Sequence, residues 1–209
     1  MSFDFITRPG PGDLHAWQVL RPLLDGRPYL PFSSGAMRAA GLVHLCNHIV
    51  HARPAQIVEC GSGVSTVVLA RLLRQRGTGR LTALEHDEGW AAEVERTLAD
   101  EGLGDVARVV LAPLQDGWYA QAGVDALPQA IDLLIVDGPP ADTAALAEAR
   151  HPALGRLAAR LHPGALVVLD DIGRGGEREV LRRWEAESGL RFERFDDEAI
   201  ATATVPSVS

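Results

Sequence analysis

Acidic residues stand at the ends of several short apolar runs of this chain. They are Glu59, Glu85, Asp137 and the neighbours Asp170 and Asp171. Apolar runs that alternate with helical stretches predict the buried strands of a parallel sheet. The carboxyl ends of parallel strands form one rim, where such sheets bind ligands, so we expect these acids to gather there. Carboxylates at that rim can accept ribose hydroxyls, pair with an amino group or coordinate a metal ion.

The stretch Glu59-Cys60-Gly61-Ser62-Gly63 predicts a strand that ends in a tight glycine turn, followed by a helix. The free N–H groups of such a helix start suit a phosphate or a carboxylate. A P-loop is excluded because no Gly-Lys-Ser/Thr follows, and the dinucleotide fingerprint is incomplete because Thr66 stands at its third glycine position. Taken alone, the turn is equally consistent with a purely structural connection.

Glu85 lies one β-α-β unit after Glu59, at the predicted end of the next strand. A carboxylate there can accept hydrogen bonds from both hydroxyls of a ribose, in a nicotinamide or in a methyl-donor cofactor. Glu59 precedes the glycines, where it would repel the pyrophosphate of a dinucleotide but suit a cofactor that carries an amino group. This acid therefore favours S-adenosylmethionine over NAD.

The elements that position these residues alternate along the chain. Strands are predicted at 56–60, 81–86, 107–111, 131–136 and 165–169, and helices at about 64–76, 88–101, 142–161 and 175–187, with the third helix broken near His151-Pro152. The runs 190–195 and 199–205 are too close for a parallel crossover and predict an antiparallel hairpin. We expect an α/β fold, a Rossmann-like, doubly wound, seven-stranded and mostly parallel sheet with an antiparallel C-terminal hairpin strand.

The chain divides into an N-terminal segment and one domain. Residues 1–32 contain Pro and Gly breakers around a short amphipathic helix, which predicts a lid or a homodimer surface. Residues 33–209 form the domain, and its first helix is predicted to run from Ser33 to about His51.

Composition narrows the functional classes. The net charge of −8 argues against a broad nucleic-acid-binding face. No signal peptide and no apolar run of membrane-spanning length is present, so no membrane partner is expected. Cys46 and Cys60 have neither metal-binding nor redox spacing, which predicts two reduced thiols in a cytoplasmic protein.

The ordered motifs resemble those of class I S-adenosylmethionine-dependent methyltransferases over about residues 33–205. The stretch from Glu59 to Thr66 resembles their first motif, Leu84-Glu85-His86-Asp87 their second-strand acidic motif, and 131–138 their fourth motif, while 161–168 is similar to their Leu-x-Pro-Gly-Gly segment. The resemblance implies the following cofactor contacts: Gly61, Ser62, Gly63 and Ser65 at the methionine portion, Glu59 near its amino group, Glu85 at the ribose, and His86 and Gln115 at the adenine, with Asp137 beside the cofactor.

Within that class, the aspartates are similar to the metal ligands of the catechol O-methyltransferase-like group of small-molecule O-methyltransferases. The resemblance implies a Mg²⁺ site at Asp137, Asp170 and Asp171, with Asp137 in the catalytic role. Pro140 stands where the catechol enzymes carry a lysine base, and no lysine occurs nearby, so the base is unassigned. The alternative is that Asp137 orients the cofactor or substrate, while Asp170 and Asp171 cap the next helix.

The sequence therefore predicts methyl transfer from S-adenosylmethionine to an oxygen of a small molecule, with or without Mg²⁺. The alternatives are a metal-independent N- or O-methyltransferase, an NAD(P)-binding oxidoreductase, and a non-catalytic module that binds the cofactor. The acceptor itself carries no recognisable code in the sequence.

Overall fold

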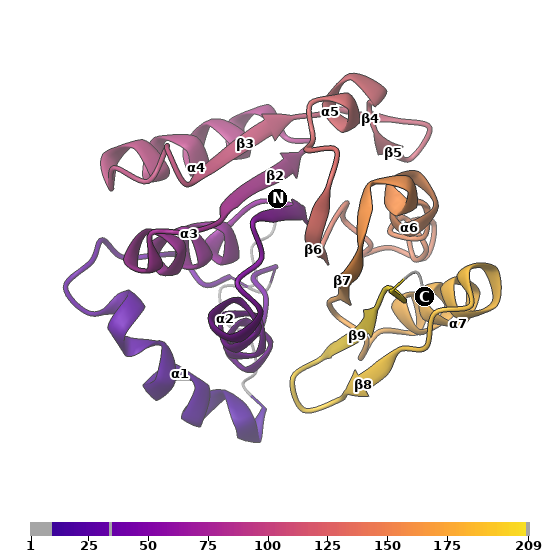
Figure 1. Ribbon diagram of the computed structural model, residues 1–209, viewed down its shortest axis with the longest axis horizontal. Coiled ribbons are helices and arrows are strands. Elements are labelled where there is room, and N and C mark those ends of the chain that lie inside the picture. Colours follow the sequence, from indigo (N-terminus) through magenta and orange to yellow (C-terminus); the bar gives the residue numbers. More distant parts are fainter. Residues whose placement is uncertain (1–9, 34, 208–209) are drawn as a thin grey trace.

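A seven-stranded sheet forms the centre of the protein in the computed structural model, which describes residues 10–33 and 35–207 (Figure 1). Its strand order is β3-β2-β1-β6-β7-β9-β8. The strands are β1 (Gln56–Cys60), β2 (Arg80–Glu85), β3 (Ala107–Leu111), β6 (Ile131–Val136), β7 (Leu161–Leu169), β8 (Glu193–Phe195) and β9 (Ile200–Thr204). The first five of these pair in parallel, whereas β9 is antiparallel to both β7 and β8. The predicted fold class is confirmed.

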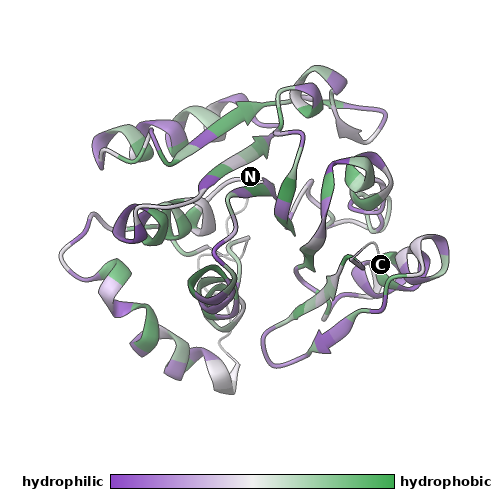
Figure 2. Cartoon of the chain, in the orientation of Figure 1, coloured by the Kyte–Doolittle hydropathy of each residue, from purple (hydrophilic) through white to green (hydrophobic). Residues whose placement is uncertain are grey.

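Helices cover both faces of the sheet. They are α1 (Pro11–Leu24), α2 (Ala39–Ala52), α3 (Val64–Arg76), α4 (Glu88–Asp100), α5 (Gln121–Asp125), α6 (Pro152–Leu157) and α7 (Gly175–Ser188), and a small hairpin of β4 (Leu114–Gln115) and β5 (Trp118–Tyr119) lies between β3 and α5. The core residues of α1 to α4 form one cluster with one side of the strands, and those of α5 to α7 form a second cluster with the other side. The central strands are mostly hydrophobic and the helices two-sided, as expected for a sheet buried on both faces (Figure 2).

The sheet has its switch point between β1 and β6. From β1 the chain continues outward through β2 and β3, then returns to the other side of β1 at β6. Neighbouring strands lead away in opposite directions there, which leaves a crevice beyond their carboxyl ends. The fold therefore places its ligand site beside Gly61 and Asp137.

Helix α2 begins at Ala39, later than the predicted Ser33, and the reason lies in another helix. Asp13 of α1 accepts a hydrogen bond from the backbone N–H of Ala40 at 3.0 Å and pairs with Arg38 at 2.8 Å. This carboxylate caps α2 from outside its own segment, which local sequence does not reveal. Pro31, Ser33, Gly35 and Met37 remain outside the helix and line the cavity described below, whereas Ser34 lies outside the described residues.

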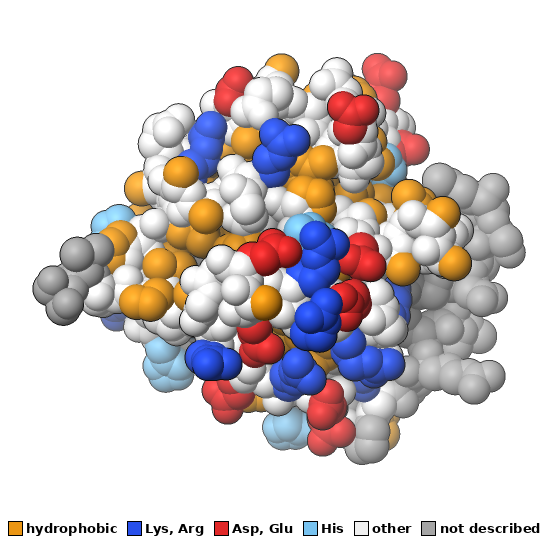
Figure 3. Space-filling model, turned by 90° about the vertical axis from the view of Figure 1, so that its right-hand side faces the viewer, with side chains coloured by type: hydrophobic (Ala, Val, Ile, Leu, Met, Phe, Trp, Pro, Cys, Tyr) orange, Lys and Arg blue, Asp and Glu red, His pale blue; other side chains and the backbone are white. Residues whose placement is uncertain are grey.

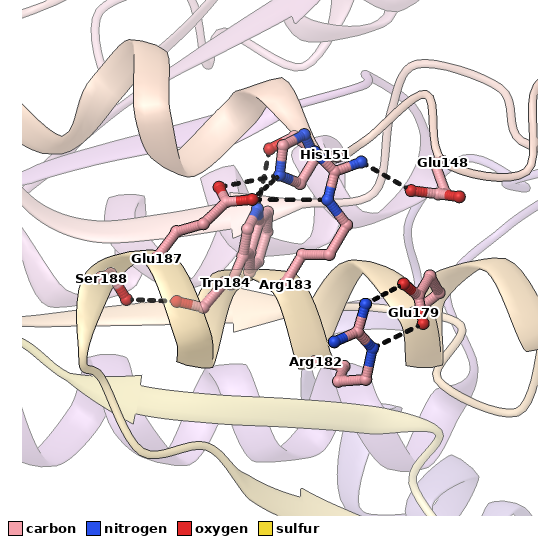
Figure 4. A network of polar contacts seen from close by, with 8 residues as sticks. All are labelled: Glu148, His151, Glu179, Arg182, Arg183, Trp184, Glu187 and Ser188. Atoms are coloured by element: carbon pink, nitrogen blue, oxygen red, sulfur yellow. Dashed lines mark hydrogen bonds and ion pairs between the residues drawn. The ribbon is translucent and has the colours of Figure 1, made fainter.

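The prediction over 142–161 is corrected for its first part, whereas the predicted break near His151-Pro152 agrees with the start of α6 at Pro152. Residues 143–151 form successive turns, and only α6 and the short 3₁₀ segment Ala158–Arg160 are helical. These turns are tied to α7, because Arg183 pairs with Glu148 at 2.8 Å and His151 contacts Glu187 at 3.0 Å (Figure 4). Contacts with α7 replace the regular hydrogen bonds of a helix here.

Charges are interspersed on the side of the molecule turned toward the viewer in Figure 3. Acidic and basic side chains alternate there without a broad area of one sign (Figure 3). On α7, Arg182 pairs with Glu179 at 2.5 Å, one turn apart (Figure 4). Among the described helices, none combines the length and the hydropathy needed to cross a bilayer.

Candidate active site

A cavity of about 620 Å³ opens at the carboxyl ends of β1, β2 and β6. Its volume falls within the range of roughly 300 to 1,000 Å³ that is usual for small-molecule sites. Part of its lining follows β1 and β2, namely Gly61, Ser62, Gly63, Val64, Ser65, Glu85, His86, Asp87 and Trp90. Another part comes from the β4–β5 hairpin and from the segments after β6 and β7, namely Tyr119, Asp137, Gly138, Pro140, Ala141, Asp142, Arg150, Asp171 and Arg174. The cavity thus combines the predicted cofactor turn with two of the three predicted metal ligands.

The glycine turn and the end of β6 approach each other closely. Gly61 has a φ of +92°, and a Cβ atom there would lie 2.9 Å from the carbonyl oxygen of Asp137. A Cβ atom on Gly138 would lie 2.5 Å from the hydroxyl of Tyr119. Only glycine fits these two positions, and their contact lets the backbone at the switch point line the cavity directly.

Glu85 connects the two strand ends within the predicted cofactor wall. Its Oε2 accepts the backbone N–H of Ser62 at 3.0 Å and the Ser62 hydroxyl at 2.9 Å. Its Oε1 accepts the N–H groups of His86 and Asp87 at 2.8 and 3.0 Å and contacts His86 Nδ1 at 2.8 Å. These hydrogen bonds hold the carboxylate at the cavity wall, and its contact with a ribose stays a prediction.

Glu59 occupies a different environment from the one predicted. Its side chain is fully buried beneath α3, outside the cavity lining. Ser65 Oγ donates to one carboxylate oxygen at 2.6 Å and Thr66 Oγ1 to the other at 2.5 Å. Burial raises the pKa of Glu59 to about 7, although these two hydrogen bonds oppose the shift. In this arrangement the Glu59 carboxylate binds the first turn of α3 and lies behind the cavity lining, and its contact with a cofactor amino group stays a prediction.

Of the two residues predicted to contact the adenine, one lines the cavity and the other does not. His86 lines the cavity, and Trp90 lies beside it and donates its indole N–H to the carbonyl oxygen of Ser62 at 2.8 Å. Gln115 instead lies exposed on β4, outside the cavity lining. The structure therefore offers His86 and Trp90 at this end of the cavity and does not place Gln115 there.

Tyr119 is a site residue that sequence reasoning missed. It is buried and lines the cavity, and its hydroxyl has no hydrogen-bond partner among the described residues. Burial raises the pKa of this phenol well above its ordinary value, so the group stays protonated. A buried hydroxyl without a partner is costly, and a ligand in the cavity could supply one. The short β4–β5 hairpin that places Tyr119 there carries no sequence signal beyond the aspartate-glycine turn at Asp116.

The aspartates at the ends of β6 and β7 meet as predicted. One carboxylate oxygen each from Asp137, Asp170 and Asp171 lies within 4.8 Å of the others. The sequence did not indicate that Arg150 would stand among them. Its Nη2 donates to Asp137 Oδ1 at 3.0 Å and lies 3.1 Å from Asp171 Oδ2. Arg174 also pairs with Asp171, at 2.9 Å.

Burial dominates the electrostatics of this cluster. It raises the pKa of Asp137, and the charge of Asp170 adds to the shift while Arg150 opposes it. Burial and the neighbouring Asp171 raise the pKa of Asp170 to about 7. Glu177 is buried on the far side of Arg150, and burial raises its pKa too. The cluster therefore holds its four acids around one buried guanidinium.

The cluster resembles a Mg²⁺ site in its ligands but contains a cation of its own. Three carboxylates are suitable ligands, and Oδ1 of Asp170 is buried without a hydrogen-bond partner among the described residues. However, the guanidinium of Arg150 already bridges Asp137 and Asp171, and the side chain of Arg150 is only 4% exposed. With this cation in place, the cluster does not fit the metal.

Comparisons with known proteins bear on the family and the fold. The sequence profile of a family described as "Methyltransferase domain" matches residues 58–172, more than half of the chain. No curated protein matches the sequence significantly.

Among solved structures, a cofactor-bound protein from MTB, Rv0187, superposes with a TM-score of 0.66 at 21% identity, over 95% of this chain and 91% of that one. A putative caffeoyl-CoA O-methyltransferase from Staphylococcus aureus gives 0.63 at 15% identity, over 92% and 96%. The O-methyltransferase TomG from Streptomyces achromogenes, in complex with SAM, gives 0.58 at 18% identity, over 97% and 92%. At these identities the likeness concerns the fold.

Proposed function

The chain belongs to the methyltransferase-domain family, which confirms the class I S-adenosylmethionine-dependent methyltransferase indicated by its sequence, and we propose that it methylates an oxygen of a small-molecule acceptor. One observation carries the proposal. A single cavity joins the glycine turn and Glu85 to the charged groups at the ends of β6 and β7. It provides a donor half and an acceptor half that share one space.

The donor half would hold S-adenosylmethionine, which supplies a methyl group activated by its sulfonium. The turn Gly61–Ser65 and the first N–H groups of α3 face the cavity and suit the carboxylate of the methionine portion. Glu85 would accept the ribose hydroxyls, and His86 and Trp90 would flank the adenine. In the structure the side chains of Ser62 and His86 contact the Glu85 carboxylate, where the ribose hydroxyls would bind. Cofactor binding would therefore turn these two side chains away from Glu85.

The acceptor half contains Asp137, Asp142, Asp171 and Arg174, and the Tyr119 hydroxyl lies beside Gly138 at the end of β6. Two O-methyltransferases of the same fold support oxygen as the methylated atom. The sequence contains 20 arginines and no lysine, so a lysine cannot act as the base. Asp137 remains our candidate for orienting the acceptor. The proposal includes no metal, because Arg150 stands among the aspartates expected to bind one.

We also propose a cellular location, a class of partner and a role for the N-terminal segment. Two buried free cysteines, Cys46 and Cys60, support a reducing, cytoplasmic location. The acidic net charge supports a small-molecule partner over nucleic acid. For residues 1–32, α1 packs on α2 and α3, and Pro31 reaches the cavity, which supports a part in covering the site; a homodimer surface remains the alternative.

Calorimetry with S-adenosylhomocysteine tests the donor half directly. We expect one site per chain for S-adenosylhomocysteine and no heat with NAD⁺ or NADP⁺ at the same concentration. Failure to bind S-adenosylhomocysteine would overturn the donor assignment. Binding without turnover of radiolabelled S-adenosylmethionine, across a panel of phenols, carboxylic acids and alcohols, would favour the non-catalytic module. Methylation of amines alone would favour the N-methyltransferase alternative.

A further inference from the structure

Arg150 is held in the middle of the acidic cluster by every nitrogen of its guanidinium. Its Nη2 donates to the carbonyl oxygen of Asp137 at 3.2 Å as well as to the Asp137 carboxylate at 3.0 Å. Its Nη1 donates to the carbonyl oxygen of Asp170 at 3.2 Å and lies 3.7 Å from Glu177 Oε1. Its Nε donates to the carbonyl oxygen of Pro139 at 3.4 Å. The arginine thus ties the end of β6 to the end of β7.

The segment that carries Arg150 is anchored on both sides. Before it, Glu148 pairs with Arg183 at 2.8 Å, and after it, His151 contacts Glu187 and receives the indole N–H of Trp184 on its carbonyl oxygen at 2.8 Å (Figure 4). Trp184 is itself buried in the core. These contacts with α7 fix the backbone on both sides of Arg150, and the hydrogen bonds of its own guanidinium fix the side chain.

A divalent ion would compete with Arg150 for the same ligands and the same space. Mg²⁺ requires oxygen ligands at about 2.0 to 2.1 Å in an octahedral arrangement. An ion held by Asp137 Oδ1 and Asp171 Oδ2 would compete with Nη2, which lies 3.0 and 3.1 Å from these two oxygens. Arginine also keeps its positive charge at any working pH, so it cannot yield by losing a proton.

We propose that the Arg150 guanidinium is the resident cation of this cluster and takes the place of a divalent metal ion. The inference rests on the proposed function and deepens it, because it makes the transferase metal-independent. Arg150 is a positioning residue: it neutralises and orients Asp137 and Asp171 at the acceptor half of the cavity. Arg174 supports it from the exposed side through Asp171.

Manganese binding to the wild-type protein provides the first test. Mn²⁺ loses its free-ion electron paramagnetic resonance signal when it binds, and Mg²⁺ competes for the same ligands. After treatment with EDTA, we expect the Mn²⁺ signal to remain at the free-ion level, and the affinity for S-adenosylhomocysteine to be the same with EDTA and with Mg²⁺. One Mn²⁺ bound per chain and displaced by Mg²⁺ would overturn the inference.

Arg150→Met provides the second test, with Arg71→Met as a matched control. Arg71 is an equally buried arginine that pairs with Glu101 at 2.6 Å, away from the cavity lining. We expect Arg150→Met to gain at least tenfold in Mn²⁺ affinity, and Arg71→Met and the charge-preserving Arg150→Lys to gain none. A folded Arg150→Met without this gain would contradict the inference. If Arg150→Met does not fold, the Mn²⁺ titrations of the wild type and of Arg150→Lys test the inference, and Mn²⁺ binding by the wild type would contradict it.

These outcomes separate the inference from the proposed function. Loss of S-adenosylhomocysteine binding under every condition would remove the methyl donor, whereas the Mn²⁺ titration would still report on Arg150. Normal S-adenosylhomocysteine binding together with a tight Mg²⁺ site would keep the methyltransferase and reject the resident arginine.

Discussion

Ser62 donates both its backbone N–H and its hydroxyl to the same carboxylate oxygen of Glu85, at 3.0 and 2.9 Å. The glycine turn after β1 is thereby fastened to the end of β2. The same carboxylate lines the cavity and is the acid for which the ribose contact is predicted. The shape of the turn therefore depends on this side chain, and under the proposed ribose contact cofactor binding would depend on it as well.

Glu85→Ala should weaken S-adenosylhomocysteine binding. Loss of hydrogen bonds to a charged acceptor costs about 1.5 to 3 kcal/mol, roughly 10- to 100-fold in Kd. Calorimetry measures the change. Glu88→Ala, an exposed acid in the first turn of α4, is the control and should bind normally. Ser62→Ala should have a much smaller effect, because its backbone N–H still reaches Glu85. Unchanged affinity in Glu85→Ala would refute the ribose contact.

Tyr119→Phe should lower S-adenosylhomocysteine affinity without reducing stability. The variant removes a buried hydroxyl that has no partner in the described residues, so the folded protein loses no hydrogen bond. We expect a Kd increase of about five- to tenfold, the equivalent of one neutral hydrogen bond. Tyr29→Phe on the exposed surface is the control. Lower thermal stability with normal binding would indicate a purely structural tyrosine.

Glu59→Gln should change how stability depends on pH. Burial raises the pKa of Glu59 from 4.5 to about 7, so the folded state retains a proton that the unfolded state releases. The contribution of Glu59 is full below about pH 4.5 and is lost as pH rises toward 7, by about 3 kcal/mol. Urea unfolding of both proteins at pH 5 and pH 8 tests this. Relative to the wild type, the glutamine variant should have a higher free energy of unfolding at pH 8 than at pH 5. The same difference between the two proteins at both pH values would contradict the raised pKa of Glu59.

Asp13→Ala should destabilise the protein by about 3 kcal/mol, because it leaves Arg38 and the start of α2 without their acceptor. Burial raises the pKa of Asp13, but hydrogen bonds from Arg38, Ala40 and Gly10 outweigh it and lower the pKa overall. This stabilisation is present above the ordinary pKa of 3.8 and is lost as pH falls below it. Asp25→Ala removes an exposed pair with Arg21 and should cost at most about 1 kcal/mol. If urea unfolding shows the same loss of stability for Asp13→Ala and Asp25→Ala, the capping role of Asp13 is wrong.

Gly138→Ala should destabilise the switch point, whereas Gly155→Ala should not. The added Cβ would lie 2.5 Å from Tyr119 Oη and 2.8 Å from the backbone nitrogen of Gly61. Overpacking of this kind costs about 1 to 3 kcal/mol or more. Gly155 lies within α6 with no atom in reach of a new Cβ, so alanine should stabilise it by about 0.5 to 1 kcal/mol. Thermal unfolding of both variants distinguishes the two positions, and a tolerated Gly138→Ala would argue against close contact there.

Local sequence patterns predicted those elements whose boundaries depend on the hydrogen bonds and the apolar periodicity of their own segment. The buried strands, the helix after Gly63 and the C-terminal hairpin are all of this kind. The start of α2 depended instead on Asp13 of another helix, and the turns over 143–151 depended on α7. Both were mispredicted because their stabilising partners are distant in sequence.

The sequence by itself determined the family, the parallel sheet and the gathering of acids at one rim, because strand ends and residue types fix these. Only the tertiary structure decided what each acid does there. It buried Glu59 under Ser65 and Thr66, left Glu85 at the cavity wall, and inserted Arg150 between Asp137 and Asp171. Carboxylates at one rim can serve as hydrogen-bond acceptors, metal ligands or partners of a buried arginine. Which role each takes depends on the cation and donors that folding brings within about 3 Å, the reach of a hydrogen bond.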